Sequence, residues 1–185
     1  MLAGQPSLKR SHSNNHSNTV PPEPRRLVLD QNFPLQAALL PWPPAVNLTP
    51  LRDVNPLLTA GYEDWQVMLA LHQRGNIDGF ITNDVRILSS AREMVVFSRK
   101  RLGLVVTDGV GHDAMRATGL LMVHLAAIAA SLTGEPRIFR LRPTQVQPIT
   151  AGVQINRVAT HRSIAPNLLI TQELAEAGDL ARPVL

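Results

Sequence analysis

The chain has 185 residues, which is enough for one domain of ordinary size with a core that needs no disulfide or structural metal. It contains no cysteine, so disulfide frameworks, thiolate metal sites and thiol catalysis are excluded, and any metal must bind oxygen or imidazole. Its 18 Lys and Arg against 14 Asp and Glu give a net charge of +4. This surplus suits a phosphate-rich partner but is also common in proteins that bind no nucleic acid.

The N-terminal residues differ in composition from the rest of the chain. Residues 1–24 are rich in Ser, Asn, His and Pro and have few large apolar side chains, so we expect a disordered arm. The arm lacks the apolar run of a signal peptide, and the most apolar stretch, 120–132, is shorter than the roughly 20 residues that span a bilayer. We therefore expect a cytoplasmic protein with no membrane segment, in which 120–132 belongs to a buried core helix.

Between residues 25 and 143, short apolar runs that end in Asp or Asn alternate with helix-like segments, which is typical of a parallel sheet with crossover helices. The predicted strands are 27–29, 45–51, 79–82, 103–107 and 137–141. The predicted helices are a short one near 34–40 and longer ones over 62–73, 85–99 and 112–131. Residues 144–185 mix β-branched residues with Pro and Gly, and only 170–177 looks helical, so we expect a partly ordered C-terminal extension.

Three predicted strands end in an acid, namely Asp30, Asp84 and Asp108, and Asp64 lies in the first turn of helix 62–73. The carboxyl ends of strands in an open parallel sheet border the crevice where ligands bind, so these acids converge if the strands are neighbours. Carboxylates this close repel one another unless a cation neutralises them. Mg²⁺ and Mn²⁺ are the usual cations, because they prefer oxygen ligands and keep waters, one of which can attack a phosphodiester.

Each acid also has a purely structural explanation. Asp84 and Asp108 stand where a helix N-cap is expected. Asp64 and its neighbour Glu63 would favour the positive end of the helix dipole wherever their side chains pointed, and Asp53 is a further competitor for the same place in a site. The joint placement of the acids at strand ends and a helix start is what favours a shared site over separate structural roles.

Two segments, LVLDQNFP and GYEDWQVMLALHQRGNIDGFITND, carry a family resemblance. The first resembles the opening of PIN-like proteins, where the first strand ends in Asp followed closely by Asn and Pro. The second resembles their next block, a helix with an acid in its first turn and then a strand ending in Thr-Asn-Asp. The resemblance covers about residues 25–142 and is strongest to the PIN-like toxins of bacterial toxin–antitoxin pairs. It implies a PIN-like three-layer α/β sandwich around a mostly parallel sheet of four to five strands.

Carried over residue by residue, the resemblance implies that Asp30, Asp64 and Asp84 are catalytic acids that bind the metal. It also implies that Asn32 and Thr82 orient these acids. The spacing along the chain leaves room for a strand and a helix between successive acids, as a shared site at one end of a sheet requires.

The fourth catalytic acid is expected to be Asp108, which ends the next strand, with Asp113 as the alternative one turn into the following helix. If neither faces the site, it holds one metal or does not cleave. Arg86 is expected to contact substrate near the metal. His112 lies in a Gly-Val-Gly-His-Asp loop near the predicted site, where it either contacts phosphate or starts the helix.

The resemblance thus implies a metal-dependent endoribonuclease, a hydrolase that uses Mg²⁺ or Mn²⁺ to cut RNA and acts as a toxin with a cognate antitoxin as protein partner. Two alternatives stay open. One is a catalytically inactive PIN-like module that binds a protein or a nucleic acid. The other is a phosphatase-like or receiver-like α/β domain, although no convincing Lys follows a later strand as a receiver requires. The sequence does not decide whether the chain forms a homodimer.

Overall fold

The structure is a computed structural model that describes residues 23–110, 113–143 and 145–178. Its sheet has six strands in the order β2-β1-β3-β4-β5-β6, and all neighbours are parallel except β5 and β6. The strands are β1 (Arg25–Leu29), β2 (Val46–Pro50), β3 (Gly79–Thr82), β4 (Gly103–Thr107), β5 (Arg137–Arg142) and β6 (Gln145–Thr150). The predicted α/β class and mostly parallel sheet are confirmed, with one strand more than the four to five expected.

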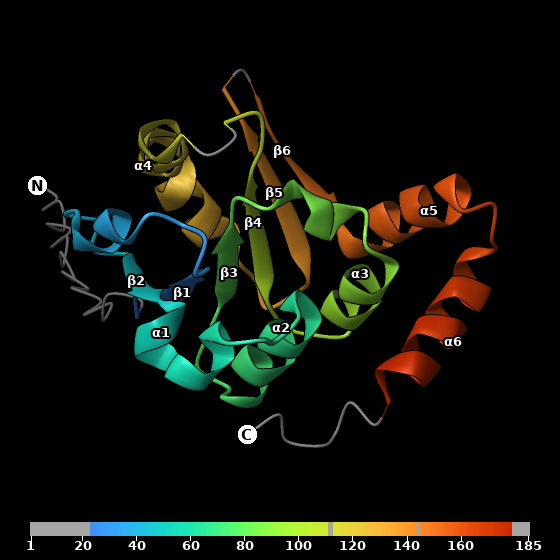
Figure 1. The fold of residues 1–185 in the computed structure, drawn as a ribbon. Helices are drawn as coiled ribbons and strands as arrows, with labels where there is room; N and C mark the ends of the chain where they lie inside the picture. The colour runs from blue at the N-terminus through green and yellow to red at the C-terminus, as the bar shows by residue number, and fades with distance from the viewer. Residues whose placement is uncertain (1–22, 111–112, 144, 179–185) are drawn as a thin grey trace, which may run out of the picture.

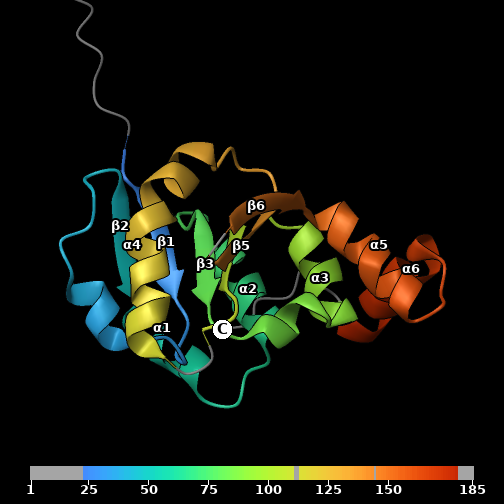
Figure 2. The same ribbon diagram turned by 90° about the horizontal axis from the view of Figure 1, so that it is seen from above.

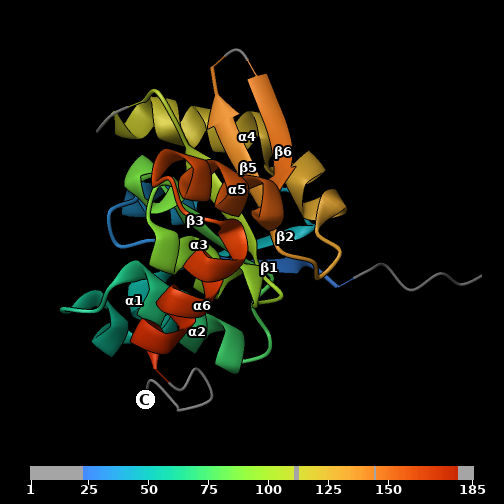
Figure 3. The same cartoon turned by 90° about the vertical axis from the view of Figure 1, so that its right-hand side faces the viewer.

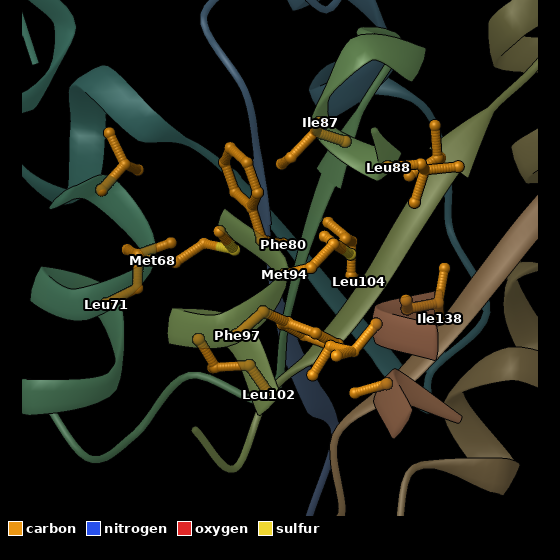
Figure 4. Close-up of a cluster of buried hydrophobic side chains, with 14 of the residues drawn as sticks. Met68, Leu71, Phe80, Ile87, Leu88, Met94, Phe97, Leu102, Leu104 and Ile138 are labelled. Atoms are coloured by element: carbon orange, nitrogen blue, oxygen red, sulfur yellow. The ribbon is translucent and has the colours of Figure 1, made fainter. Parts of the chain in front are cut away.

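The central strands β3 and β4 are buried at every position, as expected for parallel strands that are covered on both faces. Because successive side chains of a strand point to opposite faces, neighbouring residues enter different cores. Phe80 belongs to one apolar cluster together with Met68 and Met94, and Figure 4 shows these three side chains meeting beside the sheet. Ile81 belongs to the cluster on the other face.

Helices cover both faces of the sheet (Figures 1 and 2). The α-helices are α1 (Leu51–Val54), α2 (Asp64–Gln73), α3 (Ala91–Ser98), α4 (Ala114–Ser131), α5 (Ala151–His161) and α6 (Pro166–Ala177). Three 3-10 helices accompany them in the described residues, namely η1 (Leu35–Leu39), η2 (Pro56–Thr59) and η3 (Val85–Leu88). Helices α2 and α3 pack on one face, and α4 packs on the other.

The helix predicted over 85–99 is two elements in the structure. The 3-10 helix η3 ends at Leu88, and α3 begins only after Ser90, whose extended backbone forms its N-cap. Ser is favoured at an N-cap and disfavoured inside a helix, which accounts for the break. The break turns Glu93 from a residue inside a long helix into one in the first turn of a new helix.

The segment expected to be a partly ordered extension contributes to the main fold in its described residues. Strand β6 pairs antiparallel along β5, and this hairpin forms one edge of the sheet (Figure 3). Helices α5 and α6 lie against α3, where Ile155 and Leu169 join the same apolar cluster as Phe97. Residues 144 and 179–185 lie outside the described residues, as do residues 1–22 of the arm expected over 1–24.

The apolar stretch 120–132 lies in helix α4 up to Ser131, with Leu132 as the C-cap, and the helix is buried along one side only. Its buried side packs on the sheet and consists of Ala117, Leu121, Leu125, Ile128 and Ala129. Its other side exposes Met115, Met122 and Val123. Within the described part of the chain, α4 is the helix that is long and apolar enough to cross a membrane by length and composition, a test that core helices also pass.

Gly79 and Gly103 are cross-strand neighbours at the start of β3 and β4. A Cβ atom on Gly79 would lie 2.8 Å from Cδ2 of Leu27 and 2.9 Å from the carbonyl oxygen of Gly103. Because the second contact is with backbone, we expect Gly79→Ala to lower the free energy of unfolding by about 1–3 kcal/mol.

Urea denaturation measures this loss, and Gly119→Ala in α4 is its matched control. A Cβ on Gly119 meets nothing within 4 Å, so the same change should raise the free energy of unfolding by about 0.5–1 kcal/mol. Equal stabilities for Gly79→Ala and the unmodified chain would contradict the close packing of these two strands.

Candidate functional site

Asp30 and Thr82 lie side by side at the carboxyl end of the sheet, because Asp30 follows β1 and Thr82 ends the neighbouring strand β3. The Thr82 hydroxyl donates a hydrogen bond to Oδ2 of Asp30 at 2.8 Å, and Nδ2 of Asn32 lies 3.4 Å from the same oxygen. The Asp30 side chain is nearly fully buried, and this burial raises its pKa against the opposing effect of the Thr82 hydrogen bond. Thr82 and Asn32 therefore fix the orientation of the Asp30 carboxylate.

Asp84 follows at the same strand end and has an arginine partner. The backbone N–H of Asp84 donates to the Thr82 hydroxyl at 3.0 Å, which links the two acids through one side chain. Oδ1 of Asp84 caps η3 by accepting from the Arg86 backbone N–H at 2.9 Å. Hydrogen bonds from the Arg86 guanidinium, one of them 2.5 Å from Nη2 to Oδ2, lower the pKa of Asp84. In the structure Arg86 thus holds an acid of the predicted site.

Asp64 is the first residue of α2, whose start is fixed by a hydrogen bond of 2.9 Å from the Glu63 backbone N–H to Oε1 of Gln66. Burial, together with the negative charges of Asp30 and Asp84, raises the pKa of Asp64 to about 6. The Asp64 side chain forms no hydrogen bond or salt bridge with another described residue. The negative charges of Asp30 and Asp84 therefore disfavour the ionised form of Asp64.

Glu93 is a fourth acid near this group that the sequence prediction missed. It lies in the first turn of α3 and is half-buried. Burial raises its pKa most, a hydrogen bond with Ser90 opposes this, and the charges of Asp64, Glu63 and Asp84 raise it further. The sequence does contain a signal, since Ser90 followed three residues later by Glu93 is a helix-start pattern. We define the acidic cluster as Asp30, Asp64, Asp84 and Glu93.

The side chain of Asp108, the expected fourth acid, is hydrogen-bonded to residues of β5, on the side of β4 away from β3. Its Oδ2 accepts a hydrogen bond of 2.7 Å from Nε of Arg140 and another of 2.7 Å from Nε of Arg142, both on β5. Burial disfavours the charged form of Asp108, but the hydrogen bonds from Arg142 and Arg140 outweigh it and lower the pKa. The alternative fourth acid, Asp113, caps α4 by accepting from two backbone N–H groups of its first turn.

His112, expected to contact substrate, lies outside the described residues. The competing acids Asp53 and Glu63 have local partners. Asp53 is exposed and lies 3.6 Å from Arg52 of the same helix. Glu63 accepts a hydrogen bond of 2.5 Å from the indole of Trp65. Asp64 is close enough to Asp30 and Asp84 for their charges to raise its pKa.

The chemistry of the acidic cluster suits a hard cation, because carboxylate oxygens are the ligands that Mg²⁺ and Mn²⁺ prefer. Its conformation does not form a closed cage: in the part of the chain that the structure describes, no three His, Asp or Glu side chains are arranged to hold a metal ion. The partners explain this arrangement, because Asp30 is turned toward Thr82 and Asp84 toward Arg86. To bind a cation, the Asp84 carboxylate would have to give up its hydrogen bonds with the Arg86 side chain.

A polar cleft of about 330 Å³ continues from the cluster toward the C-terminal helices. Glu63 and Glu93 line its near end, and Glu173 of α6 lines its far end. Arg92 pairs there with Glu173 and Glu176, which ties α6 to α3. Arginine thus partly neutralises the acids of this cleft at the α6 end. Within 23–110, 113–143 and 145–178, no arginine or lysine forms a salt bridge with Asp64.

Comparison of the chain with protein-family models, curated proteins and solved structures found no match.

Proposed function

We propose that the chain is a metal-dependent endoribonuclease with a PIN-like fold. One observation carries the proposal: Asp30 and Asp84 follow neighbouring strands at the carboxyl end of the sheet, close enough to Asp64 that their charges, together with burial, raise its pKa to about 6. Buried acids that repel one another at the carboxyl end of a parallel sheet are expected where a site binds a cation, and perturbed acids of this kind concentrate at functional sites. The proposal extends, on the resemblance of residues 25–142 to PIN-like toxins, to a cytoplasmic toxin with a cognate antitoxin.

Asp30, Asp64 and Asp84 are the residues that would hold Mg²⁺ or Mn²⁺. When bound, the cation supplies neutralisation of the carboxylates and activation of the water that attacks phosphorus. The chain's own residues prepare this place. Thr82 donates to Asp30 and keeps its carboxylate in one orientation, so little reorganisation is needed there. Asp64 has no competing partner among the described residues, and its ionisation is what a cation would favour.

A second candidate function is a PIN-like binding module without turnover. The pairing of the acids with arginine favours it. The Arg86 side chain donates hydrogen bonds to Asp84, and those of Arg140 and Arg142 donate to Asp108. A site in which arginines satisfy two of the acids keeps its fold without a metal. Such a module would bind RNA or a protein and leave it intact.

Incubation of the purified chain with labelled single-stranded RNA in Mn²⁺, in Mg²⁺ and in excess chelator separates the two candidates. The nuclease proposal expects cleavage with either cation and none with chelator. A mock preparation from cells that do not express the chain, purified in parallel, controls for contaminating ribonuclease. RNA that binds but stays intact in both cations would support the binding module and refute the nuclease.

A further inference from the structure

Arg140 and Arg142 form a basic pair at the same end of the sheet as the acidic cluster. Both extend from β5 on one face, two residues apart, and each donates through Nε to the same oxygen of Asp108. The side chain of Asp108 is 16% exposed, while those of Arg140 and Arg142 are 37% and 48% exposed. The carboxylate is thus largely covered, and the guanidinium groups face solvent.

The register of the sheet places this pair close to the acids. Thr82 of β3 is opposite Val106 of β4, which is opposite Arg140 of β5. Residues opposite each other in a sheet point to the same face, so Arg140 shares the face of Thr82, to which Asp30 is bonded. Two strand spacings separate Thr82 from Arg140, which is about 10 Å between their backbones. One extended strand of nucleic acid can reach both places.

The charge of the group favours an anion. Two guanidinium groups share one carboxylate, so the group keeps a net positive charge. Asp108 uses the Nε donors, and among the side chains that the structure describes none bonds the terminal Nη groups. The planar fork of these Nη groups matches the oxygens of a phosphate. Asp108 also limits the rotamers of both arginines, which lowers the entropy lost on binding. The Asp108 carboxylate therefore orients both guanidinium groups for binding of an anionic ligand such as a phosphate.

We propose that Arg140 and Arg142 bind a backbone phosphate of single-stranded RNA next to the acidic cluster, with Asp108 as their positioning residue. The proposal rests on the proposed ribonuclease function for the identity of the ligand. It gives Asp108 a role different from that of a fourth metal ligand. Phosphate contacts of this kind fix the register of the strand and carry no sequence information.

The test measures binding of a labelled single-stranded RNA by fluorescence anisotropy in chelator, so that cleavage does not interfere. We expect Arg142→Gln to weaken binding about 5- to 10-fold at low salt and to reduce the slope of log K against log salt by about 0.7. Arg137→Gln is the matched control, because Arg137 is on the same strand at its opposite end and its nearest acid is Glu135 at 3.6 Å. It removes the same charge and should change affinity by less than about twofold.

Asp108→Ala tests positioning by the sign of its effect. Removal of a negative charge alone would tighten RNA binding, whereas loss of positioning should weaken it about 3-fold or more. The weakening should vanish when Asp108→Ala is added to Arg140→Gln/Arg142→Gln, because residues that act through each other are not additive. Tighter binding by Asp108→Ala would overturn the positioning role.

The same assay with single-stranded DNA of equal sequence identifies the contacted group. A backbone phosphate predicts the same loss for Arg142→Gln on both nucleic acids, and a loss limited to RNA would overturn the phosphate assignment. No binding of RNA by the unmodified chain, or equal effects of Arg142→Gln and Arg137→Gln, would overturn the site. Arg142-dependent binding without cleavage in Mn²⁺ would leave the site standing while refuting the nuclease, and cleavage with no Arg142 dependence would do the reverse.

Discussion

Asp84→Asn should lower metal-dependent RNA cleavage at least about 100-fold and weaken Mn²⁺ binding while the fold is preserved. The substitution removes one ligand charge from the acidic cluster at nearly constant volume. Oδ1 of Asn can still accept the hydrogen bond that caps η3, since Asn caps as well as Asp. The pair with Arg86 is lost, but the arginine is exposed, so stability changes little. Cleavage rates and calorimetric Mn²⁺ titration measure the two losses.

Asp113→Asn is the matched control for this experiment. Asp113 is also an Asp N-cap, and it accepts from the backbone N–H groups of Met115 and Arg116 at 3.1 and 3.0 Å. The change removes the same charge from a helix start outside the acidic cluster, so cleavage should stay within about twofold of the unmodified chain. Full, chelator-sensitive cleavage by Asp84→Asn would show that Asp84 is only a cap.

Asp64→Asn should raise the free energy of unfolding of the metal-free chain at pH 7 by about 1–2 kcal/mol, less than the full pKa shift implies because solvent screens the partly exposed side chain. The pKa of Asp64 is about 6 in the folded chain against a reference value of 3.8, so ionisation at neutral pH costs stability. Asn cannot ionise and avoids this cost. Addition of Mn²⁺ should reverse the ranking, because the cation stabilises the unmodified chain more than the variant.

The pH dependence follows with a definite sign. Between about pH 4 and 6 the folded chain keeps the Asp64 proton more tightly than the unfolded chain does, so this group lowers stability as the pH rises through that window. Above pH 6 the cost is constant, and below pH 4 it is absent. Urea denaturation from pH 4.5 to 7.5 should therefore show the gain of Asp64→Asn growing with pH. A gain of the same size for the exposed Asp53→Asn, or no growth with pH, would contradict coupling within the acidic cluster.

The strands were predictable because their signal is local. The five predicted strands lie within two residues of β1 to β5, and three of them, β1, β3 and β4, are followed within two residues by an acid. Strand β6 was not predicted, since Pro148 removes a hydrogen-bond donor, a loss that is tolerated at a sheet edge. The amphipathic period of α5, with Ala151, Ile155 and Val158 on its buried side, was present in the sequence but was obscured by Gly152 next to its first residue.

The residues of the candidate site also differ in whether a local sequence signal could identify them. Asp30, Asp64 and Asp84 could be grouped from the sequence because strand ends and helix starts share one edge of a parallel sheet. Glu93 was missed because one helix was predicted over 85–99, although the pattern from Ser90 to Glu93 marks the true start of α3. The pairing of Asp108 could not be predicted, because Arg140 and Arg142 are 32 and 34 residues away and only the order of the strands brings them together.

The packing of α5 and α6 on α3 has a consequence for synthesis on the ribosome. Phe97 of α3 shares one apolar cluster with Ile155 of α5 and Leu169 of α6, which are translated much later. At ordinary elongation rates, α3 waits about 3 to 10 s before α5 begins to be made. During that interval the apolar side of α3 is exposed, so the nascent chain needs either fast completion or a chaperone. Slow codons between the two segments should therefore lower the yield of soluble chain without any change in its sequence.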